Sequence, residues 1–372
     1  MTDLDALFQR PAAPPIGVTS GHVMTVLGPL PVARMGITLP HEHILLDGSK
    51  KWRPACNCGQ VADLAERPLS MDILGELRVA PVANRDNCML DDVDLAVEEL
   101  AKFKTLGGET IVDATSAGIG RDPKALQDIS RRTGLNIVMG CGFYLSPAHP
   151  ASVATKSIDE LADEMVYEVG GMETRPRVLA GLIGEIGVSP EFVPDEEKCL
   201  RAAARASART KVPLSIHLPG WERYGERVLD IVEEEGADLA HAILCHMNPS
   251  HEDLPYQRRL AARGAFLEYD MIGIDFYFGE KQVQSPSDEQ NARAICRLIE
   301  DGFLDRLLLS HDVFLKMMLM KYGGFGYGHI LKNFVPRLRT HGLGERQLRT
   351  LLVDNPRRVF SAETVASPAA AH

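Results

Sequence analysis

The chain has 372 residues, of which 45% are hydrophobic and 24% are charged, and its formal net charge is −11. This composition is typical of a folded globular protein and excludes a collagen-like or intrinsically disordered chain. The excess of acidic residues argues against a protein that binds nucleic acid through a basic surface. It argues equally against attachment to an acidic membrane face. We therefore expect a small-molecule partner and neither a nucleic-acid nor a membrane partner.

No run in the sequence approaches the roughly 20 apolar residues that a membrane-spanning helix needs. The N-terminus carries Asp3 and Asp5 and lacks the apolar core of a secretory signal. The seven cysteines are an odd number spread over a long chain, which fits reduced thiols better than a disulfide framework. These features predict a cytoplasmic protein.

The chain is expected to form one domain over residues 21–362, with tails at residues 1–20 and 363–372 that are rich in small residues. Within the domain, short apolar runs alternate with amphipathic helical segments, which is the pattern of a parallel sheet. The predicted strands are, in chain order, Met35–His43, Glu109–Thr115, Leu135–Cys141, Val178–Val188, Val212–His217, Ala242–His246, Ala265–Asp270 and Arg306–Asp312.

Eight strands, each followed by a helical segment, predict a (β/α)8 TIM barrel. A doubly wound open sheet is the alternative, but it usually has fewer strands and begins with a glycine-rich turn that this sequence lacks. The stretch from Leu45 to Leu90 is too long for an idle connection, so we expect this loop after the first strand to cover the site.

Polar residues that a core would not tolerate occur at the expected site, the C-terminal ends of the strands. His41 and His43 end the first strand and point to the same side, because side chains alternate along a strand. Glu185 lies alone in an apolar strand, where an unpaired carboxylate would be costly. Three later strands end with His217, His246 and Asp312. Each residue alone could be structural, and Glu185 could belong to a buried ion pair, but together they predict one site.

Four imidazoles and two carboxylates are more ligands than one tetrahedral ion needs. They predict two divalent ions, with one carboxylate reaching both, as in two-metal hydrolases. Nitrogen and oxygen ligands without thiolate favour zinc, and manganese, cobalt or iron are alternatives.

Several segments of the sequence resemble one known family. They are Thr38-Leu-Pro-His41-Glu-His43, Gly184-Glu185-Ile-Gly187, Leu267-Glu-Tyr-Asp270, Ser310-His-Asp312 and Met320–Tyr327, together with His217 and His246. They are similar to the phosphotriesterase family of the amidohydrolase superfamily, and most of all to its phosphotriesterase-related (resiniferatoxin-binding) branch. The resemblance covers nearly the whole chain and implies a (β/α)8 barrel, a binuclear metal centre and a homodimer.

The resemblance also implies roles for the residues. The family's ligands to its more buried ion correspond to His41, His43 and Asp312, and those to its more exposed ion correspond to His217 and His246. The bridging ligand is a carboxylated lysine in the phosphotriesterases and lactonases but is Glu185 here, so no bicarbonate requirement is expected. The aryl-phosphotriesterases also have a proton-relaying aspartate and histidine where this sequence has Asn248-Pro249 and Met271. An enzyme that acts on a carbon centre is therefore favoured over a dedicated phosphotriesterase.

We expect a metal-bridging hydroxide to attack the carbonyl of a carboxylic amide, ester or lactone, with an N-acyl amide favoured. Asp312 would accept the proton and pass it to the leaving group. Tyr144 lies where the family's lactonases place a tyrosine beside the site, although packing on a loop is an alternative role. A phosphotriester hydrolase and a non-catalytic ligand-binding barrel are the alternative functions.

The residues that contact the substrate are sought in the loops after the last two strands. Phe276 and Met317 are expected to line an apolar pocket, and Lys316 is expected to bind an anionic group of the substrate. Core packing explains the first two equally well, and a solvated surface charge explains the third.

Overall fold

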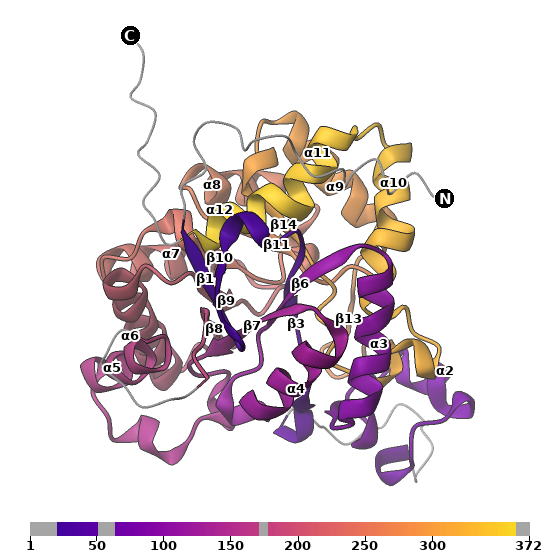
Figure 1. Ribbon diagram of the computed structural model, residues 1–372, viewed down its shortest axis with the longest axis horizontal. Helices are drawn as coiled ribbons and strands as arrows, with labels where there is room; N and C mark the ends of the chain where they lie inside the picture. The colour runs from indigo at the N-terminus through magenta and orange to yellow at the C-terminus, as the bar shows by residue number, and fades with distance from the viewer. Residues whose placement is uncertain (1–20, 51–63, 171–177, 362–372) are drawn as a thin grey trace.

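The computed structural model describes residues 21–50, 64–170 and 178–361, which form a ring of parallel strands surrounded by helices (Figure 1). Neighbouring strands pair in the order β14, β11, β10, β9, β8, β7, β6, β3. The barrel strands are β3 (Ile37–Glu42), β6 (Gly108–Asp113), β7 (Asn136–Cys141), β8 (Leu182–Gly187), β9 (Leu214–His217), β10 (Ala242–Leu244), β11 (Phe266–Tyr269) and β14 (Leu307–Leu309).

The two outer strands of this order meet and close the ring. The main-chain N–H of Asp312 donates to the carbonyl oxygen of His41 (3.3 Å), and the N–H of His41 donates to Ser310 Oγ (3.1 Å). The predicted (β/α)8 barrel is confirmed.

Helices follow the strands and cover the outside of the barrel (Figure 1). The helix α4 shows how the local sequence sets its start, because Asp122 accepts the N–H groups of Lys124 and Ala125 (both 3.0 Å) and Pro123 fits the first turn. The helices are α2 (Leu74–Leu77), α3 (Val93–Thr105), α4 (Pro123–Thr133), α5 (Ile158–Glu168), α6 (Pro194–Thr210), α7 (Gly225–Glu234), α8 (Leu254–Ala262), α9 (Asp288–Glu300), α10 (Val335–Thr340), α11 (Glu345–Arg349) and α12 (Asn355–Phe360).

Three small antiparallel pairs complete the fold. They are β1 (His22–Thr25) with β2 (Gly28–Pro31), β4 (Leu46–Asp47) with β5 (Met89–Leu90), and β12 (Tyr277–Phe278) with β13 (Val283–Gln284). The pair β4–β5 joins the two ends of the long loop after β3, which also holds α2. Residues 51–63 of that loop lie outside the described residues, as do the predicted tails.

Side chains alternate between the inside and the outside of the barrel along each strand, and this divides the apolar residues between two cores. Outward-facing residues such as Ile111 and Leu267 join the large core beneath the helices. Inward-facing strand residues form a second apolar core together with residues of β1, of the turn after β2 and of α12. The polar inward-facing residues come near the C-terminal ends of the strands. This second core contains Val23, Val32, Met35, Val112, Val138, Leu182, Ile243, Cys245, Phe266, Leu308, Val359 and Phe360.

Six of the eight barrel strands end one to three residues earlier than the sequence predicts, and two of them do so before a residue with a left-handed backbone. The strand β10 ends at Leu244 and β14 ends at Leu309, whereas the predicted strands continue to His246 and Asp312. These two residues have left-handed backbones, with φ of 59° and 51°, and a strand cannot continue through that conformation. Backbone strain of this kind gathers at functional sites. In the described part of the chain, no helix is both long enough and apolar enough to cross a membrane.

Candidate metal centre

The six predicted metal ligands lie at the C-terminal mouth of the barrel. Five of them are almost completely buried, with at most 7% of their surface exposed, namely His41, His43, Glu185, His246 and Asp312. The side chain of His217 is 16% exposed, so this residue lies nearest to solvent. The structure therefore brings together residues from β3, β8 and β9, from the position directly after β3, and from the segments after β10 and β14.

One half of the cluster is formed by His41, His43, Asp312 and Glu185. Asp312 Oδ1 lies 3.7 Å from His41 Nε2 and 3.3 Å from His43 Nε2. Glu185 Oε1 lies 3.4 Å from His43 Nε2, and Glu185 Oε2 lies 3.6 Å from His41 Nε2. Two ligands that each bind a tetrahedral zinc ion at about 2.1 Å are roughly 3.4 Å apart. These spacings therefore match those of ligands around one ion.

The other half of the cluster shares Glu185 with the first. Glu185 Oε2 lies 3.0 Å from His217 Nδ1 and 3.6 Å from His246 Nε2, and those two nitrogens are 2.7 Å apart. The preceding residue, Gly184, permits this close approach of β8 to β9, because a Cβ there would lie 2.4 Å from the carbonyl oxygen of Ser215. One carboxylate thus contacts both halves.

Several polar atoms of the cluster are not satisfied by the protein. His41 Nε2, His43 Nε2 and Asp312 Oδ1 are buried and have no hydrogen-bond partner among the described residues. Buried polar atoms without a partner are rare, and a bound cation would satisfy all three. Imidazole and carboxylate donors suit zinc and similar divalent ions. The residues present therefore fit a metal site.

Two buried acids that were not among the predicted site residues contact the Nδ1 atoms of two of the histidines. Glu268 Oε2 lies 3.0 Å from His41 Nδ1, and Asp270 Oδ1 lies 3.0 Å from His246 Nδ1. Carboxylates in this position fix the orientation and tautomer of a metal-binding histidine. The sequence did contain a signal for them, because two acids two residues apart in an apolar strand point to the same side.

Glu42, the last residue of β3, lies between His41 and His43, points away from the cluster and anchors the loop that carries Asp312. It accepts the main-chain N–H of His311 at Oε1 (2.9 Å) and that of Val313 at Oε2 (3.0 Å). Its Oε1 also lies 2.7 Å from His311 Nδ1. His311 therefore faces away from the cluster, as strand alternation predicts, while the loop holding Asp312 is fixed on both sides.

The acidic and imidazole groups of the cluster shift one another's pKa values towards the charged forms. Burial raises the pKa of Glu185, but the imidazoles of His217 and His246 outweigh burial and hold this pKa well below its ordinary value. Burial lowers the pKa of His246, but the neighbouring carboxylate of Asp270 raises it to about 10. Without a cation, protons on the imidazoles balance the acids. A divalent ion that binds here must displace such protons.

A cavity of about 230 Å³, which we name the site cavity, opens over the cluster and is bordered by His217, His246 and Asp312. Tyr144 also lines it, with its hydroxyl oxygen 3.5 Å from His217 Nδ1. Burial, reinforced by the charge of Glu185, raises the pKa of Tyr144 well above its ordinary value, so the hydroxyl stays protonated. The other lining residues are Val82, Leu145, Leu218, Pro219, Gly220, Trp221, Met271, Phe278, Glu280, Lys281 and Phe314.

Three of the four predicted substrate contacts lie away from the site cavity, the exception being Tyr144. Phe276 and Met317 line a separate cavity. Lys316 is 9% exposed, and its Nζ lies 2.5 Å from Asp86 Oδ1, in the loop after β3. That lysine is therefore bound within the protein.

The site cavity is also lined by residues that were not among the predicted site residues. Lys281 follows the strand β12, and its Nζ lies 5.6 Å from the centre of the Trp221 ring. No local sequence pattern marks these two residues, because loops after β9 and β11 bring them together. Met271 also lines this cavity, and its N–H donates to the buried side chain of Asn248 (3.1 Å). These two residues supply no acid–base group in place of the relay of the aryl-phosphotriesterases.

Comparison with known proteins places the chain in a family. The sequence profile of the Phosphotriesterase family matches residues 21–360. N-acetyltaurine hydrolase from Xenopus tropicalis is 34% identical over 346 residues, which cover 91% of this chain and 97% of that protein. Phosphotriesterase-related protein from Nematostella vectensis is 34% identical over 344 residues, which cover 91% of this chain and 98% of that protein.

A solved structure shows the same fold. The crystal structure of a resiniferatoxin-binding protein from Rhodobacter sphaeroides is 54% identical, with a TM-score of 0.89 over 94% of this chain and 97% of that one. The barrel fold, the buried cluster of histidines and carboxylates, and the named relatives together define a metal-dependent hydrolase. The chain belongs to the phosphotriesterase family. The predicted family and its phosphotriesterase-related (resiniferatoxin-binding) branch are confirmed.

Proposed function

We propose that the chain is a binuclear metal-dependent hydrolase of small N-acyl amides whose amine part carries an anionic group. The observation that carries this proposal is the buried set of four imidazoles and two carboxylates at the floor of a cavity that is also lined by Lys281. The Xenopus tropicalis relative is named N-acetyltaurine hydrolase. Its named substrate is an amide with a sulfonate, which supports both parts of the proposal.

The metal ligands that we propose fall into two groups joined by Glu185. The first group is His41, His43 and Asp312, and the second is His217 and His246. The donor set favours zinc, with manganese, cobalt or iron as alternatives. Bound ions of this kind lower the pKa of a water molecule and polarise a carbonyl oxygen. The short distances from Glu185 to both groups support its role as the shared ligand.

Asp312 is the residue that we propose as the general base and acid. It borders the site cavity, which the attacking water and the substrate would occupy. It would accept the proton of the attacking water and then donate it to the leaving nitrogen, which needs that proton because an amine anion is a very poor leaving group. Tyr144, with its protonated hydroxyl, would donate a hydrogen bond to the carbonyl oxygen as negative charge develops there.

Lys281 is the residue that we propose for the anionic end of the substrate. Its ammonium lies near the Trp221 ring at the wall of the site cavity. Phe278, Phe314 and Trp221 also line that cavity, as does Glu280. An acidic group that enters therefore meets the exposed ammonium of Lys281 beside aromatic rings.

A panel of substrates on the zinc-loaded protein tests the proposal. N-acetyltaurine and N-acetyl amino acids should be hydrolysed with higher kcat/KM than neutral N-acetyl amines, lactones, aryl esters or phosphotriesters. The variant Asp312→Asn should lose most turnover while most of the metal stays bound, because the asparagine side-chain oxygen can still bind an ion. The variant Lys281→Gln should raise KM for the anionic amides about tenfold, because a charged contact contributes roughly 1–2 kcal/mol, and leave neutral amides unchanged.

Turnover of phosphotriesters or lactones alone would contradict the proposed amide substrate. A purified protein that takes up no divalent ions would contradict the metal centre and favour a ligand-binding barrel. The homodimer and the cytoplasmic location stay predictions, which light scattering and cell fractionation can test.

A further inference from the structure

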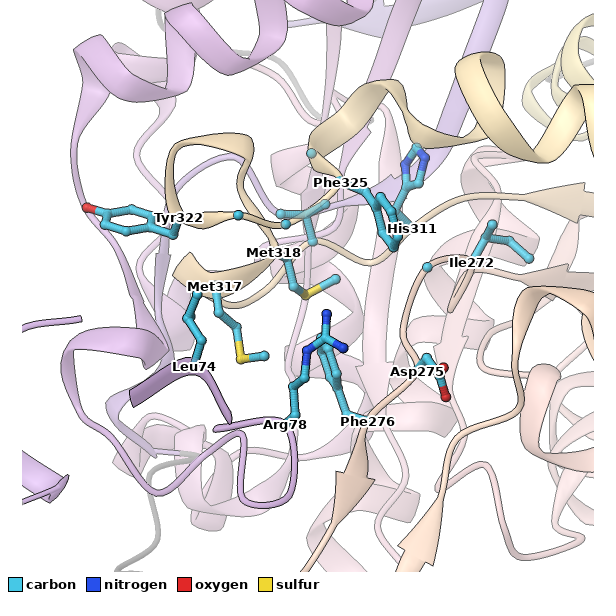
Figure 2. Close-up of a pocket in the computed structure, with 15 residues that line it drawn as sticks. Leu74, Arg78, Ile272, Asp275, Phe276, His311, Met317, Met318, Tyr322 and Phe325 are labelled. Carbon is cyan, nitrogen blue, oxygen red and sulfur yellow. The ribbon is translucent and has the colours of Figure 1, made fainter. Parts of the chain in front are cut away.

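A second cavity of about 220 Å³ lies beside the site cavity, and we name it the lateral cavity. Figure 2 shows that its walls come from three segments. Leu74 and Arg78 come from α2 and the turn after it, Phe276 comes from the loop after β11, and Met317 and Met318 come from the loop after β14. Its volume is close to that of the site cavity, so it is large enough for a small organic molecule.

The lateral cavity is separated from the metal centre by a wall that is one residue thick. Asp312 lines the site cavity, whereas its neighbours His311 and Val313 line the lateral cavity. The loop after β11 alternates in the same way, since Met271 lines the site cavity and Ile272 lines the lateral one. The two spaces are therefore distinct sites that share the loop carrying Asp312.

The walls of the lateral cavity are apolar and adaptable. Phe276, Met317 and Met318 are each 5–7% exposed, and methionine side chains adjust readily to the shape of a ligand. At the rim, the ring of Phe325 is 52% exposed and stacks on His329 at 3.9 Å. A large apolar side chain exposed beside a cavity suits the entrance of a ligand with an apolar part.

Arg78 gives the lateral cavity its positive charge. Its side chain extends into the middle of the group of lining residues, between Phe276 and Met318 (Figure 2). Its guanidinium forms no hydrogen bond or ion pair with any residue in the described part of the chain. Asp275, at the side of the cavity, is exposed and accepts a hydrogen bond from Gln284 Nε2 (3.1 Å). The arginine is thus available to an anion.

We propose that the lateral cavity binds a small organic anion, namely a carboxylate or sulfonate with an apolar chain or ring. The acidic head pairs with Arg78, whose planar guanidinium matches a carboxylate or sulfonate with two parallel hydrogen bonds. The apolar part lies among Phe276, Met317 and Met318. Binding at this site does not depend on turnover at the metal centre, so its failure and the failure of the proposed hydrolase function can be distinguished.

Isothermal titration of the full-length, zinc-loaded protein with 4-phenylbutyrate tests this site. The neutral 4-phenylbutyramide is the matched control ligand, and we expect it to bind at least tenfold more weakly. The variant Arg78→Gln should weaken binding of the acid at least tenfold, and because Arg78 is exposed, its melting temperature should equal that of the wild type. The variant Lys281→Gln, which changes the site cavity, should leave the affinity within twofold.

A crystal structure of the complex provides the second measurement. We expect the carboxylate within hydrogen-bond distance of the Arg78 guanidinium. The proposal is overturned if the acid lies only at the metal centre, if Arg78→Gln binds it as tightly as the wild type, or if the acid and the amide bind equally.

Discussion

Replacing Asp270 with asparagine should weaken metal binding without removing any metal ligand. Asp270 Oδ1 lies 3.0 Å from His246 Nδ1, and Asp270 Oδ2 accepts the main-chain N–H of His246 at 2.9 Å. In one orientation of the asparagine, its NH₂ group opposes that main-chain N–H. In the other, the NH₂ group faces Nδ1 and favours the tautomer with a proton on Nε2. A protonated Nε2, the ring nitrogen that faces Glu185, cannot bind a cation.

The expected loss of metal affinity follows from the role of carboxylates that contact metal-binding histidines. Loss of the carboxylate behind a metal-binding histidine typically lowers metal affinity 10- to 100-fold, which is about 1.4–2.7 kcal/mol. Asp270 is fully buried, so solvent does not replace the lost interaction. We expect a value within this range, with the ion at the more exposed half of the centre affected most.

Competition with a chromophoric chelator would measure the zinc affinity of each variant. The control is Asp288→Asn, because Asp288 Oδ2 lies 2.7 Å from His329 Nε2 in a carboxylate–histidine pair outside the metal cluster. That variant should bind zinc within twofold of the wild type. If Asp270→Asn also bound zinc as tightly as the wild type, this would contradict the inference that Asp270 keeps His246 in the tautomer that binds metal.

Three further predictions concern the same centre. The variant Glu185→Ala should lower the zinc content below that of the wild type in elemental analysis and abolish turnover, because this carboxylate contacts both halves; an unchanged zinc content would contradict the shared ligand. The variant Tyr144→Phe should lower kcat about 10- to 100-fold without lowering zinc content, since one hydrogen bond to a developing oxyanion is lost; unchanged kcat would leave Tyr144 a packing residue. Zinc binding at pH 8 should release protons, because the pKa of His246 near 10 keeps its imidazole protonated in the metal-free protein. Zinc affinity should therefore rise as the pH approaches that pKa. Calorimetry in buffers of different ionisation enthalpy can measure both the affinity and the released protons. An affinity that is constant from pH 6 to 9 would contradict this linkage.

The sequence by itself determined the barrel and the meeting of its strand ends. Apolar runs separated by amphipathic segments can bury both of their faces only in a parallel sheet covered by helices. Once the strands are parallel, their C-terminal ends share one side of the barrel. His41, Glu185 and His217 could therefore be placed together from their strand positions alone, although they are far apart in the chain. The alternation of strand residues also predicted that His311 faces away from the cluster.

Only the tertiary structure decided which loop residues face which cavity. The sequence predicts Lys316 as a substrate contact, but in the structure Lys316 pairs with Asp86, 230 positions earlier in the chain. Phe276 lies in the same loop as Lys281, yet they line different cavities. The reason is physical: a strand residue has two possible faces, fixed by local alternation, whereas the direction of a loop residue depends on contacts between distant segments that no local pattern encodes.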